Sequence, residues 1–72
     1  MLVTIFSGPG EAFRVRELAP ESCQALTMKW CNFYDDAVEF IRKNYSEGDA
    51  LSPDEFRQEV LYRRTHPEVR NG

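Results

Sequence analysis

The chain is poor in the residues that build most metal and catalytic sites. It has two cysteines, Cys23 and Cys31, and one histidine, His66, among 72 residues. A structural zinc site needs four ligands with paired spacing, and a nucleophilic cysteine needs a base beside it. The cysteines are eight positions apart, and His66 lies next to a proline near the end of the chain. We therefore expect no metal, no cofactor and no enzymatic activity.

Long apolar runs are also missing. The apolar stretch Leu2 to Phe6 ends at Ser7-Gly8-Pro9-Gly10, well short of a secretion signal or of the roughly 20 residues that span a membrane. Two cysteines are too few for the disulfide framework of a secreted mini-protein. The sequence thus predicts a soluble cytoplasmic protein in which both thiols are reduced.

The chain also lacks a strong excess of charge of either sign. Nine Lys and Arg stand against twelve Asp and Glu, which leaves a net charge of −3 and argues against broad affinity for nucleic acid or acidic membranes. The composition is otherwise globular, with 42% hydrophobic and 12% aromatic residues. We expect one small domain, residues 1–72. Its core is thin enough that a homodimer or a partner would add useful stability.

The N-terminal part of the chain predicts a β-hairpin. Leu2 to Phe6 is rich in β-branched and aromatic residues, which favour a strand. The Ser7 to Gly10 segment is a turn signal, and Ala12 to Leu18 then alternates, with Phe13 and Val15 on one face. Because this loop joins two strands and includes a proline, it does not fit a phosphate-binding loop.

The middle of the chain fits two structures. Leu26, Met28 and Trp30 alternate with polar or small residues, as in a third strand. Cys23, Leu26, Trp30 and Phe33 are also spaced as on one face of a helix. We favour the strand, because the period-two pattern has little competition within this window.

A first helix follows. Asp35 and Asp36 near its start and Arg42 and Lys43 near its end match the helix dipole, and Gly48 is expected as its C-terminal cap. Its apolar side covers about 160° of the helical wheel. That side consists of Phe33, Tyr34, Ala37, Val38, Phe40, Ile41 and Tyr45.

The second helix has a clear start signal. Ser52 can cap it, and Glu55, three residues later, completes a capping box. The helix is expected to end at about Arg64, because Pro67 prevents it from going much further. Residues 67–72 are predicted to form a frayed tail.

Together these elements predict an α+β fold, a small antiparallel sheet packed against two α-helices. Each amphipathic element must cover another, so we expect both helices on one face of the sheet. In that arrangement Phe13, Val15 and Trp30 would meet Ala37, Phe40 and Ile41.

The last helix has an unusual apolar pattern. Phe56 and Val60 define its core-facing side, but Leu61 and Tyr62 lie roughly 140° and 120° away from Phe56 in opposite directions. Either the helix is wedged between two surfaces, or Leu61 packs under the tail, or apolar groups are displayed to a partner. The predicted partner-binding residues are Glu55, Glu59, Leu61, Tyr62 and Arg63.

By elimination, the sequence favours a non-catalytic protein-binding module, such as an inhibitor or adaptor that docks on a larger cytoplasmic protein. Domains this small are common among inhibitors encoded by phages and mobile elements, an analogy of class alone. The alternative is a small nucleic-acid-binding protein that uses Arg63, Arg64 and Arg70. It is less favoured because the aromatic residues are expected on apolar faces, whereas a single-strand binder interleaves them with arginines.

Overall fold

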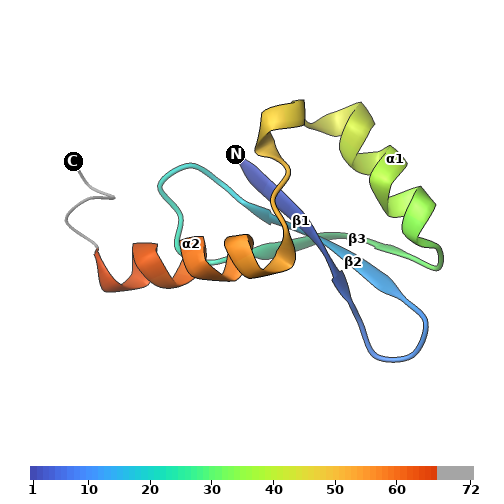
Figure 1. Cartoon of the computed structure of the whole chain (residues 1–72), viewed down its shortest axis with the longest axis horizontal. Helices are drawn as coiled ribbons and strands as arrows, with labels where there is room; N and C mark the ends of the chain where they lie inside the picture. The colour runs from blue at the N-terminus through green and yellow to red at the C-terminus, as the bar shows by residue number, and fades with distance from the viewer. Residues whose placement is uncertain (67–72) are drawn as a thin grey trace.

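The computed structural model describes residues 1–66 and shows a three-stranded antiparallel sheet with two helices (Figure 1). The elements are β1 (Leu2–Ser7), β2 (Phe13–Leu18), β3 (Leu26–Cys31), α1 (Tyr34–Asn44), the 3₁₀ turn η1 (Glu47–Asp49) and α2 (Pro53–Thr65). The α+β class, the N-terminal hairpin and the third strand are confirmed. The predicted tail, 67–72, lies outside the described residues. No helix in the described part is long and apolar enough to cross a membrane.

The hairpin turn depends on its glycines. The Gly8 N–H donates to the Ala12 carbonyl at 2.8 Å, which closes the loop between β1 and β2. Gly10 has φ +71°, a left-handed conformation that glycine adopts without steric cost. In the sheet, Leu2 lies opposite Leu18 and Ser7 opposite Phe13, so the two strands pair over their full lengths.

One face of the sheet packs against α1, and the core lies there. Val3, Val15, Cys31 and Ala37 are buried at its centre. Partly buried residues surround them, namely Ile5, Phe13, Phe40, Ile41 and Tyr45. The predicted contact of Phe13 and Val15 with the apolar side of the first helix is therefore confirmed.

The expectation that both helices share one face is wrong. The ring of Phe56 in α2 meets Phe6 edge-on, with 5.8 Å between ring centroids, on the face opposite Val3 and Ile5. In Figure 1 the sheet runs between α1 and α2. Val3 and Thr4, neighbours that point to opposite faces, are 0% and 2% exposed because each face is covered.

The connection between the helices explains this arrangement. The Leu51 N–H donates to the Val3 carbonyl at 2.9 Å, and Ala50 forms a parallel bridge with Val3. The Thr4 hydroxyl in turn donates to the Leu51 carbonyl at 2.8 Å. The chain thus passes along the outer edge of β1 and reaches the second face of the sheet before α2 begins.

Trp30 does not face α1 as expected. It lies opposite Arg14 in the register, whereas its neighbour Cys31 lies opposite Phe13 and takes the buried position. Residues directly opposite each other share a face of the sheet. Trp30 therefore lies on the α2 side, where it is 54% exposed.

A β-bulge breaks the alternation predicted for β3. Lys29 lies opposite Val15 and Thr27 opposite Arg16, so Met28 is the extra residue of the bulge. Leu26 lies opposite Glu17, on the face away from Trp30, although the sequence pattern placed both on one face.

The helix ends follow the sequence in most respects. Ser52 and Glu55 form both bonds of the capping box, at 3.1 and 3.2 Å. The expectation that Gly48 caps α1 is wrong. The helix ends earlier, at Asn44, where the extended Tyr45 donates its N–H to the Ile41 carbonyl, and Gly48 lies within η1.

Replacing Glu21 with glycine should stabilise the fold. Glu21 has φ +64° in a turn closed by Ser22 N–H to Ala19 O at 3.1 Å. Pro20 precedes it, as in a type II turn, whose third residue favours glycine. Glycine relieves the left-handed strain of the folded state, but it also makes the unfolded chain more flexible. The net effect should be an increase of about 0.5 kcal/mol in the free energy of unfolding.

Urea unfolding measures this change. Glu11→Gly is the matched control, because Glu11 lies in the other loop and is not among the residues with positive φ. It should destabilise the protein. A loss of stability in Glu21→Gly as large as that of the control would contradict the turn geometry.

Alkaline pH should weaken the fold through Tyr45. Its hydroxyl donates to Glu17 Oε1 at 2.6 Å. Burial, and then the hydrogen bond and charge of Glu17, raise the pKa of Tyr45 from 10.0 to about 12. The folded state holds this proton more tightly than the unfolded state does, so the stabilisation is complete below pH 10 and is lost as the pH rises toward 12.

Unfolding followed across this pH range, together with the ultraviolet absorbance of phenolate, tests the contact. Tyr45→Phe should remove both the last step of the phenolate titration and the matching part of the stability loss. An unchanged titration in that variant would show that Tyr45 does not carry the high pKa.

Candidate functional site

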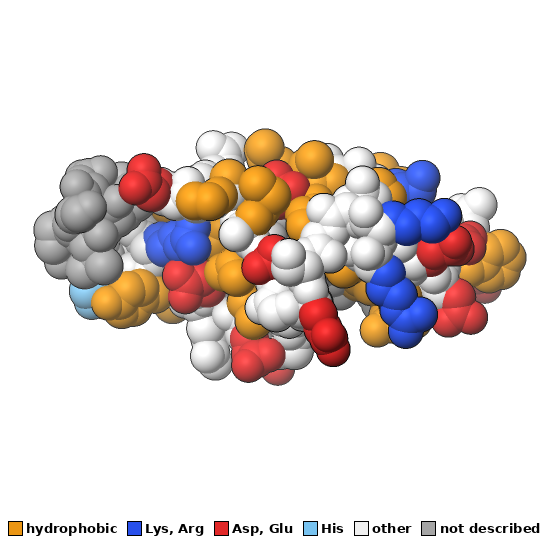
Figure 2. Space-filling model, turned by 90° about the horizontal axis from the view of Figure 1, so that it is seen from above, with side chains coloured by type: hydrophobic (Ala, Val, Ile, Leu, Met, Phe, Trp, Pro, Cys, Tyr) orange, Lys and Arg blue, Asp and Glu red, His pale blue; other side chains and the backbone are white. Residues whose placement is uncertain are grey.

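Exposed apolar side chains are concentrated along β3 and the link to α1. On the face shown in Figure 2, apolar, acidic and basic groups are intermixed. Five of the eight large hydrophobic residues that are exposed in residues 1–66 fall within nine positions. They are Leu26, Met28, Trp30, Phe33 and Tyr34. Since Leu26 and Trp30 lie on opposite faces of the sheet, these side chains give β3 exposed apolar surface on both faces, and exposed apolar groups gathered in this way are typical of an interaction surface.

β3 is also an edge strand. The strand order is β1-β2-β3, so one side of β3 pairs with β2 and the other has no strand beside it within residues 1–66. Its first five residues are exposed, and Cys31 alone is buried. The opposite edge differs, because Ala50 pairs with Val3 there. Unpaired backbone groups on an exposed edge are a template for another strand.

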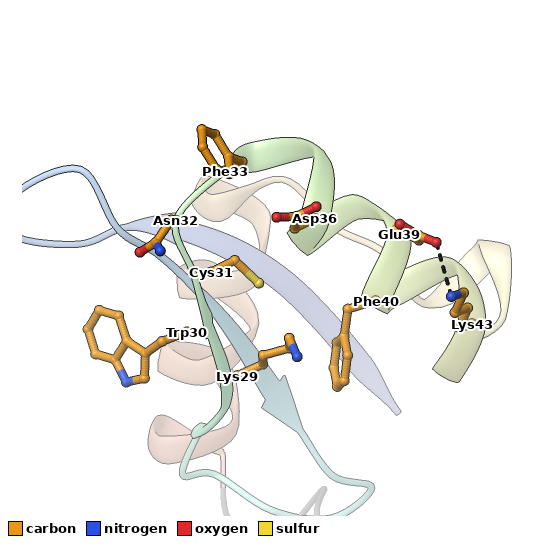
Figure 3. A pocket seen from close by; sticks show the side chains of 9 residues that line it. All are labelled: Lys29, Trp30, Cys31, Asn32, Phe33, Asp36, Glu39, Phe40 and Lys43. Carbon is orange, nitrogen blue, oxygen red and sulfur yellow. Dashed lines mark ion pairs between the residues drawn. The ribbon is translucent and has the colours of Figure 1, made fainter.

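A hollow of about 560 Å³ lies between β3 and α1 (Figure 3). Lys29 points across it from β3, with its Nζ atom 5.4 Å from the centroid of the Phe40 ring. On α1, Lys43 forms an ion pair with Glu39 at 3.0 Å. Trp30 points away from α1. The hollow thus has an apolar wall and charges of both signs at its rim.

A second hollow lies between α2 and the other face of the sheet. We call it the arginine groove, because Arg14, Arg16, Arg57 and Arg64 line it. Its other lining residues are Phe6, Gln24, Ala25, Phe56, Val60 and Leu61.

Arginines and aromatic rings alternate at this groove. The Arg14 guanidinium lies 5.9 Å from the Phe6 ring and 5.5 Å from the Trp30 ring, and Arg57 lies 4.6 Å from Phe6. The expectation that aromatic residues are not interleaved with arginines was made for Arg63, Arg64 and Arg70. It did not include Arg14 and Arg57, which the fold brings beside aromatic rings.

Leu61 and Tyr62, predicted to bind a partner, are 63% and 47% exposed. Leu61 lines the arginine groove, and the Tyr62 ring stacks on His66 with 4.2 Å between centroids. Within residues 1–66 the helix is therefore not wedged between two surfaces. The alternative that Leu61 packs under the tail concerns residues outside the described part.

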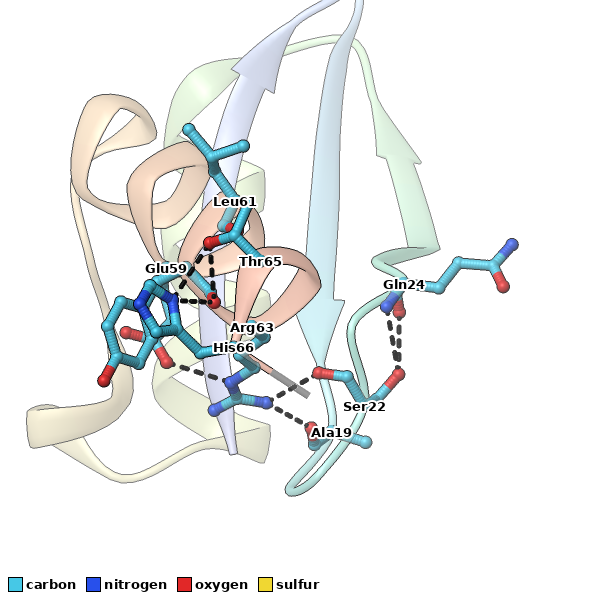
Figure 4. A network of polar contacts seen from close by, with 9 residues as sticks. Ala19, Ser22, Gln24, Glu59, Leu61, Arg63, Thr65 and His66 are labelled. Carbon is cyan, nitrogen blue, oxygen red and sulfur yellow. Dashed lines mark hydrogen bonds and ion pairs between the residues drawn. The ribbon is translucent and has the colours of Figure 1, made fainter. Parts of the chain in front are cut away.

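The three charged residues predicted beside them make internal contacts, and Figure 4 shows those of Glu59 and Arg63. Glu55 belongs to the capping box. Arg63 Nε donates to Glu59 at 2.9 Å, and its Nη1 donates to the carbonyls of Ala19 and Ser22, both at 2.9 Å. Arg63 thus fastens α2 to the loop between β2 and β3. A contact of these three residues with a partner stays a prediction.

Two of the three arginines of the nucleic-acid alternative lie in the described part, and both donate to the loop between β2 and β3. Arg63 is held by the β2–β3 loop, with 18% of its side chain exposed. Arg64 Nε donates to the Cys23 carbonyl at 3.1 Å and lines the arginine groove. Arg70 lies outside the described residues.

The residues that could carry chemistry are dispersed. Cys23 is half-buried and Cys31 is buried, and neither forms a disulfide. No three His, Cys, Asp or Glu side chains gather as metal ligands in the described part of the chain. No protein-family model matches this chain, and no curated protein or solved structure does so either.

Arg63→Ala should destabilise the fold, because it leaves the Ser22 carbonyl without a donor and the Ala19 carbonyl with the Ser22 N–H alone. We expect a loss of about 2–3 kcal/mol in the free energy of unfolding. Arg42→Ala is the control, since that side chain is exposed on α1 and forms no ion pair within residues 1–66. It should change stability by less than about 0.5 kcal/mol. Equal effects in urea unfolding would contradict the structural role of Arg63.

Proposed function

We propose that this protein is a non-catalytic binding module, such as an inhibitor or adaptor, that docks on a larger protein through β3. The observation that carries the proposal is an edge strand with five exposed residues and a run of apolar side chains. An exposed apolar edge is a liability for a small protein unless a partner covers it. α1 contacts all three strands, whereas α2 contacts mainly β1 and leaves the other side of β3 without a helix within residues 1–66.

Strand addition is the binding mode that fits this edge. An extended segment of the partner would pair with the backbone of β3, and its side chains would alternate between the two faces. On one face they would enter the hollow between β3 and α1, next to Lys29 and Phe40. On the other they would pack beside Trp30, which the bulge and register place on the α2 side.

The α2 surface predicted from the sequence can belong to the same docking site. Arg14 lines the arginine groove together with Leu61, and its guanidinium also covers the ring of Trp30. Contacts therefore continue from the β3 edge to Leu61. A cytoplasmic location and an origin in a phage or mobile element remain part of this proposal, supported only by the unpaired cysteines and the small size.

Replacing Leu26 and Met28 with arginine should abolish partner binding and leave the fold intact, because both side chains are exposed and charged edges resist strand pairing. The measurement is capture of proteins from nuclease-treated lysate of the native host, with a lysine-reactive crosslinker. The two lysines of the chain, Lys29 and Lys43, both line the hollow beside β3, so crosslinks report on that site.

The matched control is Asn44→Arg/Gln58→Arg, which adds two charges at exposed positions that line neither hollow. It should retain the crosslink at Lys29. If the β3 variant captures the same proteins as the wild type, the proposal is wrong. Light scattering identifies a second copy as the occupant of β3 if the 8.4 kDa mass doubles in the wild type and not in the β3 variant.

A further inference from the structure

We propose that the arginine groove binds an acidic peptide segment of the partner, one that carries apolar side chains beside its carboxylates. This inference rests on the protein-binding function proposed above and adds the chemistry of the partner.

The first argument is the sorting of charge. The chain has nine Lys and Arg and a net charge of −3. Four of these nine cations line the arginine groove, and no Asp or Glu is among its lining residues in the described part of the chain. The groove is therefore positive on a negative protein. Such local segregation attracts a ligand of opposite sign and orients it.

The second argument is unused hydrogen-bonding capacity. Within residues 1–66, the ion pairs are formed by Lys43, Arg57 and Arg63, so Arg14, Arg16 and Arg64 have no carboxylate partner there. The buried Nε atoms of Arg14 and Arg16 have no acceptor. Arg16 donates one bond, to the Ala25 carbonyl at 3.0 Å.

Arg14 and Arg16 also repel each other. They are two positions apart on β2, so both side chains point to the same face of the sheet. Burial, and then the charge of Arg14, lower the pKa of Arg16. A bound carboxylate would offset this repulsion, and arginine matches a carboxylate with two parallel hydrogen bonds.

The third argument is the apolar part of the groove, which favours a peptide over nucleic acid. Phe56 forms its buried base, and Val60 and Leu61 supply aliphatic surface toward the rim. A single nucleic-acid strand needs open aromatic faces for its bases. The Phe6 ring already has Arg57 and Arg14 against it, at 4.6 and 5.9 Å.

Trp30 provides a direct readout. It is the single tryptophan of the chain, and its ring lies 5.5 Å from the Arg14 guanidinium. The probe is a short synthetic peptide in which glutamate alternates with leucine, titrated while the fluorescence of Trp30 is followed. A matched peptide with glutamine in place of glutamate, and a single-stranded oligothymidylate, are titrated in parallel. We expect a saturable change with the glutamate peptide and binding about tenfold weaker with each of the others.

Arg14→Gln/Arg16→Gln should weaken binding of the glutamate peptide about tenfold or more. Arg42→Gln, an exposed arginine on α1, should leave it unchanged. If the first variant unfolds, Arg57→Gln/Arg64→Gln, with both residues exposed on α2, takes its place with the same expected loss.

Tighter or equal binding of oligothymidylate would overturn the proposal in favour of a nucleic-acid site. The absence of any Trp30 response to the glutamate peptide would also overturn it. Because Leu26 and Met28 do not line the groove, the two proposals fail separately. If the β3 variant loses partner capture and the wild type does not bind the glutamate peptide, the peptide site in the groove is refuted and docking at β3 stands. If the wild type binds the glutamate peptide and the β3 variant still captures the partner, docking at β3 is refuted and the peptide site in the groove stands.

Discussion

Burial of β1 on both faces is the constraint on which the rest of the structure depends. Val3 points to α1 and Thr4 to the α2 side, and neither has appreciable exposure. The Thr4 hydroxyl is satisfied by the Leu51 carbonyl, so the one buried polar side chain of the described part carries no desolvation penalty. Leu51 also donates to Val3, which fixes the point where the chain changes face.

The position of β3 follows from that constraint. This small chain has two helices, and one is needed on each face to bury the centre of the sheet. α1 contacts all three strands, whereas α2 contacts mainly β1. No helix covers the α2 side of β3 within residues 1–66, and Trp30 remains exposed there. The apolar edge arises because there are too few elements to cover it.

The same geometry gathers the arginines. Arg14 and Arg16 come from β2, and Arg57 and Arg64 come from α2, which follows them by about 40 residues in the sequence. Packing of Phe56 against Phe6 brings the two pairs to one groove. Arg63, one position from Arg64, donates to the Ala19 and Ser22 carbonyls of the β2–β3 loop and has a structural role. Arg64 donates to the Cys23 carbonyl of the same loop and also lines the groove.

Local signals in the sequence determined the elements. The turn at Gly8 to Gly10, the capping box at Ser52 and the apolar side of α1 each act over a few residues, and each predicted its element correctly. The pairing of Phe13 and Val15 with α1 also followed from periodicity. Exposure of Leu61 and Tyr62 could be anticipated because their directions on the helical wheel diverge from Phe56.

Tertiary structure alone decided which faces meet. The apolar run of β1 does not alternate, so it is compatible with cover on one face or on both, and the crossover at Leu51 selects both. The bulge at Met28 reverses the facing of Trp30 relative to Leu26, and a one-residue shift of this kind leaves no mark in a period-two pattern. The arginine groove joins residues that are distant in the chain, because side-chain neighbourhoods across a sheet and a helix depend on packing and not on spacing along the sequence.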